Sequence, residues 1–208
     1  MGAIRVIGRS LRDIWDEMLL LGLMNIVTLL AQATIVLGPP AMAGLHAMCN
    51  RVANGFAISW DNYLQACRTY FVRSWIFAVP PILISALIVY NFLFYGTFDA
   101  TWAVWVQGAW LAGLIFVTAI QFYMFPFLME QDDKRWRMAL RNSALVAGAN
   151  PLYTVVLLVV ALVLTGVFLL VLPLFVFFGL IPWVMFGNAA VVDRVAAFRK
   201  RADAAGQQ

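Results

Sequence analysis

The hydrophobic positions of this chain fall in long runs that contain no charged side chain. Asp, Glu, Lys and Arg are absent from residues 19–50, 74–98, 100–129 and 142–192. Each run exceeds the ~20 apolar residues that a helix needs to cross a bilayer. The pattern therefore predicts an all-α, polytopic transmembrane helical bundle in direct contact with the lipid bilayer.

Proline, glycine and a lone carboxylate divide these runs into hairpins. Gly38-Pro39-Pro40 interrupts the first run, because proline lacks the amide that would continue a helix and glycine tolerates a reversal of the backbone. Asp99 and Leu172-Pro173 mark two further turns. Residues 1–208 are therefore predicted to form a single integral membrane domain of three hairpins. Its six membrane helices are expected over residues 18–37, 40–54, 70–95, 101–129, 151–172 and 174–193.

The second arm of the first hairpin is short. About 15 residues from Pro40 to Asn54 would rise only ~22 Å at ~1.5 Å each, which is less than the ~30 Å hydrocarbon core. We expect this arm to be short, tilted or partly re-entrant, and the sequence leaves open whether it crosses fully.

Three segments between the runs have the pattern of amphipathic surface helices. Apolar residues recur at three- and four-residue spacing, and charged residues occupy the other faces, which is typical of a helix lying along a membrane surface. Asp132 or Asp133 is expected to cap the third segment, and Asn150-Pro151 should begin the following span, since proline suits the first turn of a helix. The interfacial helices are predicted over residues 4–17, 59–73 and 132–149.

The basic residues indicate the topology. The formal net charge is +4, and the fourteen Lys and Arg fall in four clusters that border the apolar runs. If the first run enters the membrane and returns, all four clusters lie on one face and Asp99 lies on the other. The positive-inside rule favours this arrangement, with both termini cytoplasmic, and no nucleic-acid partner is expected. The clusters are Arg5, Arg9, Arg12; Arg51, Arg68, Arg73; Lys134, Arg135, Arg137, Arg141; and Arg194, Arg199, Lys200, Arg201.

The polar side chains within the predicted spans are uncharged. Asn25, Gln32, His46 and Asn91 are among them, and no carboxylate or fixed cation accompanies them. Ion-coupled transporters usually place a charge in the membrane, so active transport is disfavoured. Hydrogen bonding between helices is the favoured role for the amides, and packing is the favoured role for His46. The candidate structural or path-lining residues are Asn25, Gln32, Gly38, Pro39, Pro40, His46, Asn91, Asn150 and Pro151.

Catalytic and cofactor motifs are absent from the sequence. It contains no Gly-x-Ser-x-Gly, His-Glu-x-x-His, Walker or dinucleotide-binding pattern. His46 is not accompanied by a cluster of Cys, Asp and Glu at ligand spacing. We therefore expect no enzyme activity, no cofactor and no metal site.

The order of several motifs resembles the YesL-like family of bacterial integral membrane proteins. These motifs are an amphipathic Trp helix, a first span with Asn25, the break Gly38–Gly44, a basic linker rich in Trp and Tyr, the segment Phe125–Leu128, and Ala144–Pro151. The family is a domain of unknown function whose genes often accompany ABC-type sugar importers and polysaccharide-degrading enzymes. The resemblance implies a location in the bacterial inner membrane and a role near carbohydrate uptake.

Two classes of function remain open. The first is an accessory or scaffold component that docks against ABC-type sugar importer subunits or a membrane sensor, and we rank it first. The second is a small channel or facilitator for a polar solute, with a path along Asn25, Gln32, His46 and Asn91. The sequence leaves the oligomeric state open.

The charge distribution makes a topological prediction. Reporter fusions placed after Gln208 should report a cytoplasmic terminus, and fusions at Phe98 should report the opposite side, because all basic clusters then share one face. A C-terminus outside the cytoplasm would reject the arrangement of three returning hairpins.

Overall fold

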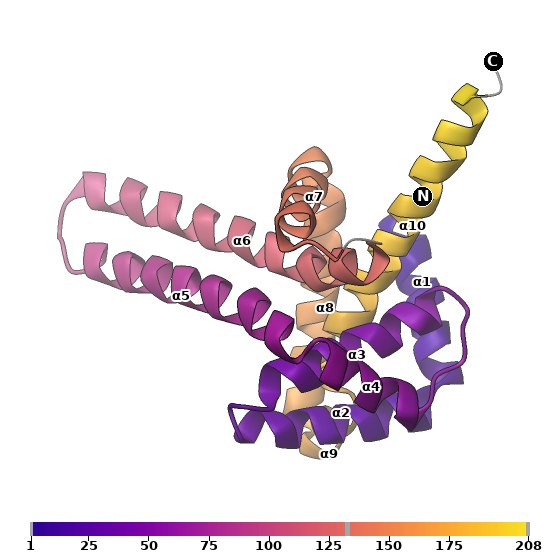
Figure 1. Ribbon diagram of the computed structural model, residues 1–208. Coiled ribbons are helices and arrows are strands. Elements are labelled where there is room, and N and C mark those ends of the chain that lie inside the picture. The colour runs from indigo at the N-terminus through magenta and orange to yellow at the C-terminus, as the bar shows by residue number, and fades with distance from the viewer. Residues whose placement is uncertain (1, 132–133, 207–208) are drawn as a thin grey trace.

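The computed structural model describes residues 2–131 and 134–206, and this part of the chain is helical with no strand (Figure 1). The predicted all-α class is confirmed. The helices are α1 (Ala3–Asp16), α2 (Met18–Ala33), α3 (Gly38–Ala53), α4 (Trp60–Thr69), α5 (Phe71–Tyr95), α6 (Thr101–Glu130), α7 (Trp136–Ala149), α8 (Pro151–Leu170), α9 (Leu172–Phe178) and α10 (Ile181–Gly206).

Four helical stretches in the described residues are long and apolar enough to cross a membrane. They are α5 with 25 residues, α6 with 30, α8 with 20, and the 29-residue stretch Leu172–Lys200 that joins α9 to α10. At ~1.5 Å per residue each reaches the ~30 Å of a hydrocarbon core. The chain is therefore a multi-pass membrane protein.

The first two predicted spans are shorter than expected. Helices α2 and α3 have 16 residues each, which corresponds to a rise of only ~24 Å. Because α1 and α2 meet at 89°, they count at most as one broken span. The structure thus supports four to five spans by length, where the sequence predicted six.

The early end of α2 has a local cause. The Thr34 hydroxyl donates to the Ala31 carbonyl at 2.7 Å and accepts from the Leu37 amide at 3.3 Å, and Ile35 has a positive φ of 58°. These bonds replace the next helical turn, so the helix stops at Ala33 and not at residue 37. Helix α3 begins at Gly38, and Pro39 lies in its first turn, where no amide donor is needed.

Helix α3 lies at the centre of the molecule. Most of its side chains are buried, and it contacts α2, α4, α5, α6 and α10. Helices α5 and α6, in contrast, lie side by side and project from the rest of the chain as a long hairpin (Figure 1). Two amide side chains join them, since Gln107 Nε2 donates to the Phe92 carbonyl at 3.1 Å and Gln121 Nε2 donates to Ser85 Oγ at 3.1 Å.

The surface helices lie near their predicted positions. Helix α1 agrees with the predicted segment 4–17. The predicted segment 59–73 is divided at Tyr70, where α4 has ended and α5 is about to begin. Helix α7 starts at Trp136 after the N-cap residue Arg135, later than the predicted start at residue 132. Asp132 and Asp133, the predicted caps, lie outside the described residues.

The last hairpin also differs from its prediction. Helix α8 starts at Pro151 as expected, and the Asn150 carbonyl accepts bonds from the Thr154 amide at 3.0 Å and hydroxyl at 3.1 Å. The turn lies at Val171, and Pro173 falls in the first turn of α9. The predicted helix 174–193 is broken between α9 and α10, and α10 continues well beyond residue 193 as a projecting charged end (Figure 1).

Contacts between distant segments bring the basic clusters together. Arg9 Nη2 donates to the Ala53 carbonyl at 3.0 Å, which holds α1 against the end of α3. Asn50 and Asn54 donate to Glu130 at 2.9 and 2.8 Å, which holds the end of α3 against the end of α6. These contacts bring Arg9 of the first cluster and Arg51 of the second to the end of α6, which the third cluster follows in the sequence.

This contact makes a prediction about sidedness. In a background with C49A and C67A, single cysteines at Ala3 and at Asn54 should be labelled from the same side of the membrane, because α1 and the carboxyl end of α3 are hydrogen-bonded. A cysteine at Phe98, beyond the tip of α5, serves as the control and should be labelled from the other side. Opposite labelling of Ala3 and Asn54 would contradict the hairpin.

Candidate functional site

Asn25 bridges a break in the helix that runs through α9 and α10. From the middle of α2, its Nδ2 donates to the Val176 carbonyl at 2.8 Å and to the Phe175 carbonyl at 3.5 Å, and its Oδ1 accepts from the Leu180 amide at 3.1 Å. Asn25 itself is fully buried. One side chain thus satisfies backbone groups on both sides of the break.

The residues around this break explain why it exists. Pro182 has no amide to donate to the Phe178 carbonyl, so the first turn of α10 cannot continue regularly from α9. The Thr165 hydroxyl of α8 donates to the Gly179 carbonyl at 3.2 Å. A side chain at Gly22 would collide with the Phe177 ring, so glycine allows α9 to approach α2 closely enough for the Asn25 bonds.

His46 is a buried, hydrogen-bonded histidine on α3. Its Nδ1 lies 3.1 Å from Asn188 Nδ2 on α10, and the same amide donates to the Val184 carbonyl at 2.8 Å. Because an amide nitrogen can only donate, Nδ1 accepts, and the ring proton is assigned to Nε2. The ring stacks on Phe125 at a centroid distance of 4.9 Å. Asn188 as the partner of His46 could not be recognised from the sequence.

His46 also borders a small cavity at the root of the hairpin. The cavity measures about 180 Å³ and is lined mostly by apolar side chains, with Gln121 as a second polar residue. Gln121 is already bonded to Ser85. Pockets for drug-sized ligands typically measure ~300–1,000 Å³, so this cavity is small for a separate ligand.

The other predicted site residues lie elsewhere. Gln32 is exposed at the end of α2, with its Oε1 beside Gly38, and Pro39 and Pro40 lie in the first turn of α3. Asn91 donates to the Leu87 carbonyl of its own helix at 2.8 Å. Asn25, Gln32, His46 and Asn91 therefore occupy four separate settings, and none is hydrogen-bonded to another in the described part of the chain.

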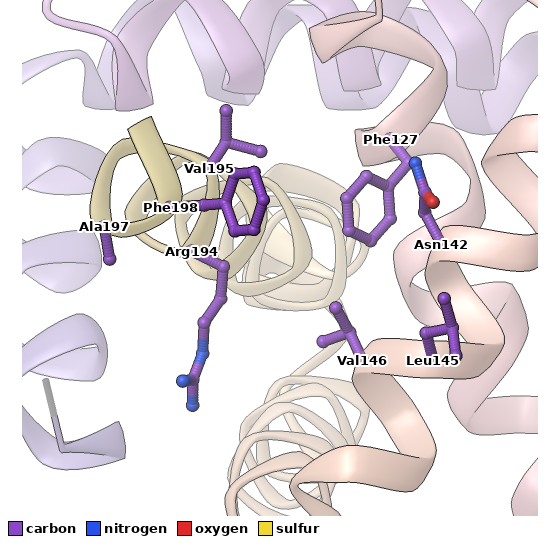
Figure 2. Close-up of a pocket in the computed structure, with 8 residues that line it drawn as sticks. All are labelled: Phe127, Asn142, Leu145, Val146, Arg194, Val195, Ala197 and Phe198. Atoms are coloured by element: carbon purple, nitrogen blue, oxygen red, sulfur yellow. The ribbon is translucent and has the colours of Figure 1, made fainter. Parts of the chain in front are cut away.

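A groove with a volume of about 410 Å³ lies between α7 and α10 (Figure 2). The rings of Phe127 and Phe198 face it from either side, and Val146 closes one edge. Arg194 points away from these rings, and its guanidinium lies 4.4 Å from the centroid of Tyr153. This cation–π contact packs Arg194, the first residue of the fourth basic cluster, against the start of α8.

Comparison with known proteins adds no assignment, since no family model, curated protein or solved structure matches the chain.

The Asn25 bridge makes a prediction about stability. N25L should destabilise the protein by about 2 kcal/mol, because backbone groups at the α9–α10 break lose their partner in a buried setting. In detergent this corresponds to a fall in apparent Tm of about 4–8 °C. N91L is the matched control, because Asn91 bonds only within α5, and its Tm should stay within about 2 °C. Equal losses in the two variants would contradict the bridging role.

Proposed function

We propose that this chain is an accessory subunit of the bacterial inner membrane that docks against a transporter or sensor of carbohydrate uptake through the α5–α6 hairpin. The carbohydrate setting rests on the resemblance to YesL-like proteins. Both termini are proposed to be cytoplasmic, in line with the gathering of basic clusters at one end of the molecule.

The projecting hairpin carries this proposal. Most apolar side chains on α5 are exposed, and only its first half contacts the central helix α3 (Figure 1). Lipid covers such a surface in a lone protein, but α6 also has a feature that suits a second helix. Gly108, Ala109 and Ala112 are exposed, and no atom lies within 4 Å of a Cβ built at Gly108 or Gly113.

Small residues on an outward face let the backbone of another helix approach closely, and close packing drives helix association in a bilayer. The Gly108-x-x-x-Ala112 and Ala109-x-x-x-Gly113 pairs thus face away from the chain's own core. They offer a partner helix a contact surface whose specificity comes from shape.

The alternative function, a small channel or facilitator for a polar solute, has less support. A path for a polar solute needs polar groups that can replace water along its length. The Asn25 amide is hydrogen-bonded to backbone groups at the α9–α10 break, and His46 Nδ1 is hydrogen-bonded to Asn188. These polar groups therefore already have partners within the fold.

Purification in mild detergent tests the docking role. A tagged wild-type chain should bring along a transporter or sensor subunit, and G108I/G113I should reduce this recovery about 10-fold, because bulk on α6 blocks close approach. G166I, on the exposed face of α8, is the matched control and should retain the partner. Unchanged recovery with G108I/G113I would reject docking through α6.

A flux measurement separates the two classes of function. Purified protein reconstituted alone in liposomes should pass no small polar solute. Reproducible flux from the lone protein would reject the accessory role.

A further inference from the structure

Four cations meet in a groove at the root of the hairpin. The groove has a volume of about 270 Å³, and Ile76, Phe77 and Trp136 form its apolar part. Its cationic lining consists of Arg73, Lys134, Arg135 and Arg137. The groove therefore combines a basic rim with an apolar floor.

The pairing of α5 and α6 creates this groove. Arg73 lies in the first turn of α5, and Lys134–Arg137 follow the end of α6 and lead into α7. Because the two helices are antiparallel, the beginning of α5 and the segment after α6 meet at the same level. This level is where the charge-free runs 74–98 and 100–129 begin and end, so it corresponds to the membrane surface.

The described carboxylates do not neutralise Arg73 or Arg137. Glu130 accepts from Asn50 and Asn54, which directs it towards α3. Neither Arg73 nor Arg137 forms an ion pair with a described residue, and Arg137 lies 5.4 Å from the Trp136 ring centroid. Asp132 and Asp133 precede Lys134 in the sequence and lie outside the described residues. Arg73 and Arg137 together give the groove two positive charges.

We propose that this groove binds the phosphate group of an anionic phospholipid. The phosphate lies among the cations, and the glycerol and first acyl carbons lie on the exposed side chains of Ile76 and Trp136. Basic pockets between membrane helices suit anionic headgroups, and a tryptophan at this depth anchors the interface. Free phosphate would satisfy the same cations, but it would leave the apolar floor uncovered, so the combination favours a lipid.

Lipid binding to the detergent-solubilised full chain tests this proposal. Binding of phosphatidylglycerol, counted by native mass spectrometry, should be about 30-fold weaker in R73Q/R137Q, since each basic residue contributes to attraction of an anionic headgroup. R199Q/K200Q removes the same charge from the exposed end of α10 and should stay within about 3-fold of wild type. Equal losses in both variants, or no loss in R73Q/R137Q, would overturn the site.

Two measurements on the wild-type protein keep the proposal testable if R73Q/R137Q does not fold. Raising the salt from about 0.05 to 0.5 M should weaken phosphatidylglycerol binding several-fold, because charges at the surface are screened. Phosphatidylcholine should bind weakly at both salt concentrations. Salt-independent binding, or equal binding of the two lipids, would overturn an electrostatic site. Complete displacement of the lipid by millimolar inorganic phosphate would overturn the role of the apolar floor and indicate a free-phosphate site.

Discussion

The fold depends on satisfying backbone polar groups where no water is available. Hydrocarbon offers no hydrogen-bond partner, so each break in a membrane helix must be closed by the protein itself. One such break lies between α9 and α10, and Asn25 closes it from α2 with bonds to the Val176 carbonyl and the Leu180 amide. This interaction fixes the depth of the short helix α2 against the last span. Helix α3 follows α2 after a tight turn, so the central helix is placed by the same contact.

Several arginines of the basic clusters have backbone carbonyls or an aromatic ring as their partners. Arg9 donates to Ala53, Arg51 donates twice to the Ala57 carbonyl, and Arg194 lies over Tyr153. Arg9 also lies 3.7 Å from the Asp13 carboxylate on the next turn of α1. Neutral partners satisfy the donors without cancelling their charge.

The spacing of apolar residues and the placement of charged residues predicted the class of fold, because both depend on what surrounds each segment. The charge-free runs predicted the bounds of α5, α6 and α8 to within a few residues, and Pro151 predicted the start of α8. Local interactions determined the helix ends that differ from the predicted ones. The hydrogen bonds of Thr34 end α2 early, and Pro182 and Gly179 interrupt the last helix. The candidate site residues show the same limit. Asn25 and Asn91 are both single asparagines in apolar runs, yet one bridges three helices and the other bonds within its own helix. Sequence spacing alone does not distinguish them.

The hairpin α5–α6 is a unit that needs the rest of the chain only at its root. Gln107 and Gln121 join its two helices along their length, so its internal polar groups are already paired. At the root, Phe125 lies between His46 and Phe77, with centroid distances of 4.9 and 5.4 Å, and this aromatic stack ties the hairpin to α3. A partner that covers the hairpin gains little from new hydrogen bonds and must gain from packing. Because lipid tails pack against apolar side chains equally well, the selectivity of the proposed docking would rest on the row of small residues on α6, which lipid fills poorly.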